Sequence, residues 1–132
     1  MITDAQIEEA KKNTQYSLSK PVHKHNDRIR IAYEWLDAQK KIKTSKRRLF
    51  HGVKHLIEAW AGRYISTSDV EVAATLHPDI QGEYPSFNLS SRLTEPALSR
   101  LNDIKEVLSH EESSWQEQCP SSHDPKDYKM KE

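Results

Sequence analysis

The sequence has very few of the residues that make turns and cross-links. Its 132 residues include three glycines, six prolines and a single cysteine. One cysteine excludes an internal disulfide, and the shortage of glycine and proline argues against a many-stranded sandwich or barrel, whose hairpins need turn residues. We therefore expect an all-α or mostly α fold, a compact bundle of about four helices. Such a bundle could be helix-turn-helix or winged-helix-like.

Long apolar runs are absent as well. No stretch approaches the roughly 20 apolar residues that cross a bilayer, and the first residues, MITDAQIEEAKK, lack the basic start and apolar centre of a secretory signal. We expect a cytoplasmic protein with no membrane partner. The hydrophobic content of 35% suffices for one modest core, which indicates a single domain.

Charge is balanced over the whole chain but not along it. The formal net charge is zero, yet residues 20–63 carry 12 Lys and Arg against four Asp and Glu. Residues 64–132 carry six Lys and Arg against 13 Asp and Glu. A neutral protein divided in this way offers a basic and an acidic surface to its partners separately.

Composition divides the chain into three regions. Residues 1–22 form an N-terminal arm with one short helix, in which Thr3 and Gln6 have the spacing of a capping box. Residues 23–110 contain the periodic apolar segments and form the helical domain. Residues 111–132 are mostly polar, and we expect a disordered tail because so little apolar area cannot offset the loss of conformational entropy.

Apolar residues recur at helical spacing in four segments of this domain. The expected helices span residues 26–42, 45–61, 67–77 and 96–109. Asn26 or Asp27 is the expected N-cap of the first, and Gly62 is suited to the position just after the second. Ser68 and Glu71 have capping-box spacing at the start of the third.

The segment before the last helix has an ambiguous pattern. It reads HPDIQGEYPSFNLSSRL and could be a loop, a wing or a short helix. In helix-turn-helix proteins a short helix supports a second one, whose polar side chains reach base edges and phosphates. Residues 85–93 are the candidate recognition segment, and its candidate contacts are Asn88, Ser90, Ser91 and Arg92. Asn88 would hydrogen-bond to adenine, and Arg92 would contact guanine or phosphate. Asp79 and Glu83 would repel phosphate. The alternative is a polar loop packed on the domain.

A dense basic run occurs at the junction of the first two helices of the domain. Its members are Lys40, Lys41, Lys43, Lys46, Arg47 and Arg48. Such a cluster attracts phosphates and steers nucleic acids, while the alternative is a solvated connection between helices. Cations in the first turn of a helix oppose its dipole, so a role other than helix stability is indicated for them.

Motifs for metal binding and catalysis are missing. His51 and His55 lie four apart on a helix, but HGVKH lacks the glutamate of a zinc protease helix. Cys119 and His123 have no second pair at a matching distance, so four convergent zinc ligands are not expected. Since the sequence shows no phosphate-binding loop and no nucleophile elbow, we expect a protein that is not an enzyme and holds no metal or cofactor.

These features favour a small nucleic-acid-binding regulatory protein, with DNA as the expected partner and a homodimer as one arrangement. The alternative is a non-enzymatic adaptor or inhibitor that binds a protein partner through its charge-segregated surface. An oligomer-forming structural module is a third interpretation. The first requires that the basic run and the polar residues near residue 90 lie on one side of the folded molecule.

Overall fold

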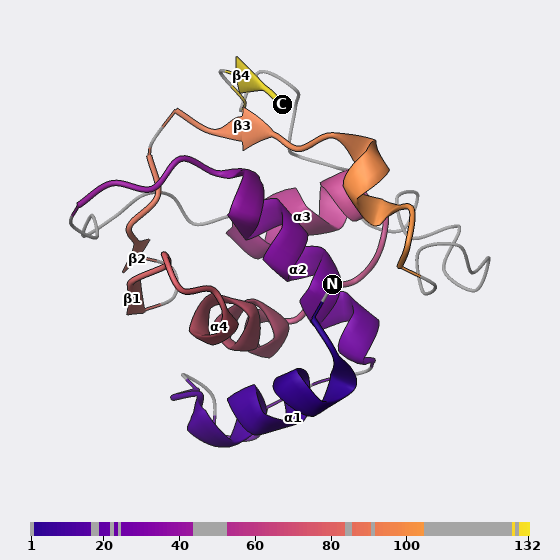
Figure 1. Ribbon diagram of the computed structural model, residues 1–132, viewed down its shortest axis with the longest axis vertical. Coiled ribbons are helices and arrows are strands. Elements are labelled where there is room, and N and C mark those ends of the chain that lie inside the picture. Colours follow the sequence, from indigo (N-terminus) through magenta and orange to yellow (C-terminus); the bar gives the residue numbers. More distant parts are fainter. Residues whose placement is uncertain are drawn as a thin grey trace.

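The computed structural model places helix α2 at the centre, with α3 and α4 packed on it and α1 along α4 (Figure 1). The structure describes residues 2–16, 19–21, 23, 25–43, 53–83, 86–90, 92–104, 128 and 130–132. The helices are α1 (Asp4–Asn13), α2 (Asn26–Ala38), α3 (Val53–Ala61) and α4 (Thr67–Leu76), followed by a 3₁₀ turn, η1 (Leu98–Leu101). The expected mostly α fold is confirmed.

Four two-residue strands complete the described part. They are β1 (Gly82–Glu83), β2 (Ser86–Phe87), β3 (Thr94–Glu95) and β4 (Met130–Lys131). Strands β1 and β2 pair antiparallel, whereas β3 and β4 pair parallel. A parallel pair joins segments that are far apart in the sequence, and here it brings the last described residues back to the domain.

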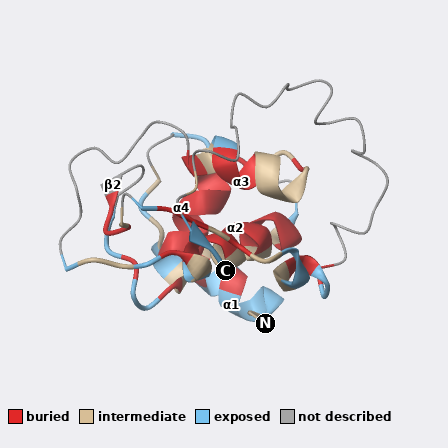
Figure 2. Cartoon of the chain, turned by 90° about the horizontal axis from the view of Figure 1, so that it is seen from above, coloured by how far each residue is buried: buried red, intermediate tan, exposed pale blue. Residues whose placement is uncertain are grey.

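Burial is concentrated on α2, α3 and α4 (Figure 2). Trp35 of α2 is completely buried and is the largest side chain of the core. On α4 every residue from Ser68 to Ala74 is buried, so this helix is covered on most of its circumference rather than on the narrow stripe that its apolar residues indicate. Because α4 lies between α1 and α2, it is covered on two sides, and its buried residues include the charged Asp69 and Glu71.

The N-terminal arm takes part in this core. Helix α1 begins with the expected capping box, in which Gln6 N donates to Thr3 Oγ1 at 3.2 Å and Thr3 N donates to Gln6 Oε1 at 2.8 Å. Ile7 is completely buried and Ala10 nearly so. The helix therefore draws its stability from packing on α4, as a ten-residue helix must.

Helix ends differ from the expected ones. The N-cap of α2 is His25, whose Nδ1 accepts from Asp27 N at 3.0 Å, rather than Asn26 or Asp27. The helix ends at Ala38 and not near residue 42, because Gln39 takes an extended conformation and the next residues join a strand-like pair. The periodicity of the apolar residues predicts the helix, but pairing with a distant segment of the chain determines the residue at which it ends.

The start of α4 is also shifted. Its capping box uses Ser66 and Asp69, not Ser68 and Glu71, with Asp69 N donating to Ser66 Oγ at 3.0 Å. Gly62 has a φ of 67°, which confirms its expected place after α3. The first part of the expected 45–61 helix falls on residues 44–52, which lie outside the described residues.

The expected 96–109 helix is wrong over its described part. Residues 94–95 form β3 and residues 98–101 form only a 3₁₀ turn, with Leu98 66% exposed. The backbone here is held by side chains of other helices, since Trp60 Nε1 donates to the Pro96 carbonyl at 3.1 Å. These tertiary bonds outweigh the local helical preference.

The candidate recognition segment and the expected tail are only partly described. Residues 86–87 are a strand of the β1–β2 hairpin and residue 89 is in a bridge, so the described part of 85–93 is extended. In the 111–132 tail, residues 130–131 form β4 and are paired with β3. Residues 111–127 and 129 lie outside the described residues.

Candidate nucleic-acid interface

The basic segment after α2 lies beside the polar segment after β2. Lys41 and Leu89 form an antiparallel bridge, flanked by Ile42 N donating to the Asn88 carbonyl at 2.9 Å and Ser90 N donating to the Lys40 carbonyl at 2.8 Å. Residues directly opposite each other in an antiparallel pair face the same side, and this register sets Lys40 opposite Ser90. Two of the stretches singled out in the sequence are therefore neighbours in space.

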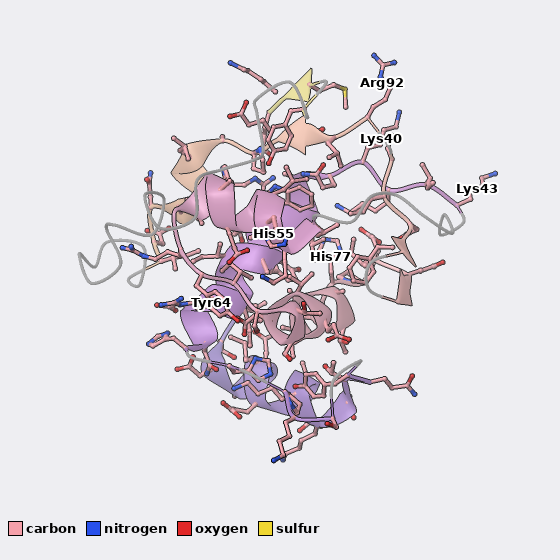
Figure 3. All side chains as sticks on the ribbon, turned by 180° about the vertical axis from the view of Figure 1, so that it is seen from behind. Lys40, Lys43, His55, Tyr64, His77 and Arg92 are labelled. Carbon is pink, nitrogen blue, oxygen red and sulfur yellow. The ribbon has the colours of Figure 1, made fainter. Side chains whose placement is uncertain are left out.

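Three cationic side chains gather along this edge. Lys40, Lys43 and Arg92 are exposed, and their side chains point outward from the same end of the molecule, away from α1 (Figure 3). None of the three forms an ion pair with a carboxylate among the described residues, unlike Lys54 and Arg100. We call Lys40, Lys43, Ser90 and Arg92 the basic edge.

Lys41 belongs to a different environment. Its Nζ donates to the Asp37 carbonyl at 2.8 Å, which turns the side chain back along the end of α2. Burial lowers the pKa of the Lys41 ammonium, against the opposing influence of the Asp37 and Asp79 carboxylates. Lys41 is therefore a partly buried, locally compensated cation and adds little to the charge that the basic edge presents.

Asn88 has a structural position that does not suit the role expected of it. The side chain is 3% exposed, and its amide makes three hydrogen bonds inside the protein. Its Oδ1 accepts from Gln81 N at 2.6 Å, while its Nδ2 donates to the carbonyls of Ile42 at 3.1 Å and Asp79 at 3.0 Å. A fully bonded, buried amide presents nothing to a base edge. Asn88 instead joins the turn after α4 to the basic segment.

The other expected contacts are only partly placed. Ser90 is half-buried, and its hydroxyl accepts from Arg92 N at 3.2 Å, so it shapes the turn toward Arg92. Lys46, Arg47, Arg48 and Ser91 lie outside the described residues. Of the ten expected contacts, four make up the basic edge, Lys41 turns back along the end of α2, and Asn88 is buried.

Three hydrogen-bonded side chains form a relay that the sequence does not predict. His23 Nδ1 lies 2.7 Å from Asp69 Oδ1, and its Nε2 lies 3.0 Å from the Tyr16 hydroxyl. The order of groups is that of a nucleophile, base and orienting acid. However, burial, followed by the charges of Glu71 and Asp69, raises the pKa of the Tyr16 phenol, and a nucleophile needs the opposite shift. The relay therefore fits a tether between the 14–23 connection and α4.

A second histidine joins helices in a similar way. His77 is 4% exposed; its Nε2 lies 2.8 Å from Asp37 Oδ1, and its Nδ1 accepts from Asp79 N at 3.1 Å. These bonds require the neutral tautomer with the proton on Nε2. No sequence pattern signals such pairs, because Asp37 and His77 are 40 positions apart. Both histidines stabilise the fold.

Metal-ligand geometry is not found among the described residues, in which no group of three or more His, Cys, Asp or Glu side chains could hold an ion. His55 Nδ1 lies 3.1 Å from Glu58 Oε1 on the same helix, while His51, Cys119 and His123 lie outside the described residues. Across the described helices, none combines the length and the apolar character that a bilayer crossing requires.

Comparison of the chain with models of protein families, with curated proteins and with solved structures gives no match in any of the three.

Proposed function

We propose that this protein is a small nucleic-acid-binding protein that contacts the phosphate backbone of DNA through the basic edge. The proposal is supported above all by the Lys41–Leu89 bridge, which sets Lys40 beside Ser90 and its neighbour Arg92. Cations from two distant segments meet there without carboxylate partners from the described residues. Like charges held together in this way repel, and a polyanion offsets that repulsion.

The side chains of the basic edge are better suited to contacts with phosphates than to hydrogen bonds with base edges. Lysine and arginine side chains and serine hydroxyls are the usual phosphate ligands, and such contacts position a protein without specifying sequence. The one amide suited to adenine, that of Asn88, is committed to internal hydrogen bonds. We therefore expect binding with little sequence preference. The basic run continues in sequence through Lys46, Arg47 and Arg48, which would extend the contact.

The neutral net charge makes the proposal testable. A chain with 20 basic and 20 acidic residues has no bulk attraction for DNA, so salt-dependent binding would require a local basic surface. The test titrates a labelled duplex with the protein at NaCl concentrations between about 50 and 200 mM, the range over which phosphate contacts lose affinity steeply.

The decisive comparison uses two paired substitutions. Lys40→Gln with Arg92→Gln removes two cations of the basic edge, and the matched control, Lys12→Gln with Lys20→Gln, removes two exposed cations elsewhere. Each lost phosphate contact reduces the slope of log K against log salt by about 0.9, so the first pair should reduce it by about 2. The control should leave it unchanged. No binding at the lowest salt, or equal slopes for both pairs, would refute the proposal.

A further inference from the structure

Strand β3 is bonded on one side by a buried side chain and on the other side by strand β4. Gln39, buried at 3% exposure, bonds both backbone groups of Thr94: its Nε2 donates to the Thr94 carbonyl at 2.8 Å, and its Oε1 accepts from Thr94 N at 2.9 Å. One side of β3 is thereby satisfied by a side chain. Because backbone groups alternate along a strand, the carbonyls of Leu93 and Glu95 face the opposite side.

Residues 130–132 of the chain itself occupy that opposite side. Met130 N donates to the Leu93 carbonyl at 3.1 Å and Glu132 N to the Glu95 carbonyl at 3.0 Å, in a parallel register that sets Thr94 against Met130. Figure 1 shows β4 lying alongside β3 at the edge of the molecule, outside the helices. An extended segment added to a sheet edge is how many domains bind peptides.

Side chains anchor this segment at both ends. At its start, the buried Trp35 donates from Nε1 to the Tyr128 hydroxyl at 3.0 Å. At its end, the Glu132 carboxylate accepts from Ala97 N at 2.8 Å and from Arg100 Nε at 2.6 Å, and its second oxygen accepts from Arg100 Nη2. The bidentate geometry between guanidinium and carboxylate is selective for an acidic side chain at this position.

We infer that the edge of β3, with Trp35 and Arg100 at its ends, is a peptide-binding site that Tyr128 and residues 130–132 fill in cis. Its ligand is an extended segment of a partner protein that carries an aromatic hydroxyl and, four positions later, a carboxylate. The segment runs parallel to β3. This site is separate from the basic edge and does not depend on nucleic-acid binding.

The bound segment has the features of an exchangeable ligand. Met130, Lys131 and Glu132 are exposed, so its attachment depends on hydrogen bonds and ion pairs rather than on buried apolar area. When Glu132 leaves, Arg100 keeps Glu34 Oε1 at 3.1 Å and Asp37 Oδ2 at 3.0 Å, and its charge stays compensated. Release therefore leaves no uncompensated cation behind.

A partner peptide must compete with a segment that is covalently joined to the site. The segment belongs to the same chain as its site, and such a covalent connection gives an effective concentration on the order of millimolar. A free peptide of the same sequence therefore binds the unaltered chain weakly, and it binds well only when the cis segment is weakened. This difference separates the site from any other surface that attracts the peptide.

The experiment uses the full chain with Tyr128→Ala and Glu132→Ala, which weakens the cis segment and leaves Trp35, Gln39 and Arg100 intact. The probe is a labelled peptide, KDYKMKE, corresponding to residues 126–132 and amidated at its C-terminus. Fluorescence anisotropy should give an affinity for the substituted chain at least about tenfold higher than for the unaltered chain.

Specificity is tested on the peptide, so that no further change can unfold the protein. Replacement of its tyrosine by phenylalanine, or of its last glutamate by glutamine, should each weaken binding severalfold, because each removes one anchor. Circular dichroism checks that the substituted chain remains folded. The inference is overturned if the folded, substituted chain does not bind KDYKMKE, if both chains bind it equally, or if the altered peptides bind as well as the parent.

Discussion

The substitution Asn88→Ala tests whether the Asn88 amide is the joint between the turn after α4 and the basic segment, and so holds the basic edge in place. The Asn88 amide makes three internal hydrogen bonds, one to the turn residue Gln81, one to Asp79 and one to Ile42 in the basic segment. A typical internal hydrogen bond contributes a net of about 1 kcal/mol, so the loss of three should lower the free energy of unfolding by about 3 kcal/mol. For a domain of this size, that corresponds to a fall of roughly 10 °C in Tm.

Urea unfolding followed by tryptophan fluorescence measures this change, because the buried Trp35 reports on the core. The control is Asn102→Ala, since Asn102 is an exposed asparagine in the turn after η1. It should change stability by less than about 0.5 kcal/mol. If Asn88→Ala cost no more than this control, Asn88 would not be the joint that we describe.

Asn88→Asp sharpens the test. A carboxylate can still accept from Gln81 N, but it cannot donate to the carbonyls of Ile42 and Asp79 and would face both of them with like partial charge. We expect this near-isosteric change to destabilise the protein at least as much as Asn88→Ala. A stable Asn88→Asp protein would show that the two carbonyl bonds are unimportant and would contradict the assignment.

Three further substitutions probe the scaffold. Ser66→Ala removes the N-cap of α4 and should cost about 1 kcal/mol in urea unfolding; an unchanged midpoint would argue against the Ser66 capping box. Gly62→Ala places a Cβ at a φ of 67° and should cost about 1 kcal/mol, whereas a gain in stability would mean that this turn is not left-handed. Arg100 lowers the pKa of Glu132 below its ordinary 4.5, so the stability from this pair is present above about pH 5 and is lost as the pH falls through the lowered pKa. Glu132→Gln should therefore flatten stability between about pH 5 and pH 3, and an identical pH profile would contradict the Arg100–Glu132 pair.

Periodic apolar residues were sufficient to predict the central helices. The stripe through Ile29 and Leu36 specifies α2, and glycine at position 62 marks the end of α3, because both signals are local. The short helix α1 was also predicted from its capping box, although its packing on α4 was not. The positions of these helices can therefore be predicted from local sequence signals, whereas the burial of each depends on contacts between helices.

The last part of the domain could not be predicted in the same way. Leu98 and Leu101 have helical spacing, yet Gln39 and Trp60 hold the preceding backbone in an extended form. Such bonds join residues more than 30 positions apart, so no pattern in a local window reports them. The same reason explains why the sequence predicts Asn88 to be a surface contact: a polar residue in a turn-rich segment gives no sign that its amide is buried.

Lysine acetylation with and without duplex DNA tests the basic edge most directly. The protein is treated briefly with an amine-reactive acetylating reagent at low salt, and modification at each lysine is quantified by mass spectrometry. We predict that saturating DNA protects Lys40 and Lys43, while Lys12 and Lys20, which are exposed and lie outside the basic edge, react at an unchanged rate. Equal protection at all four lysines, or none at Lys40 and Lys43, would contradict a nucleic-acid contact at this edge.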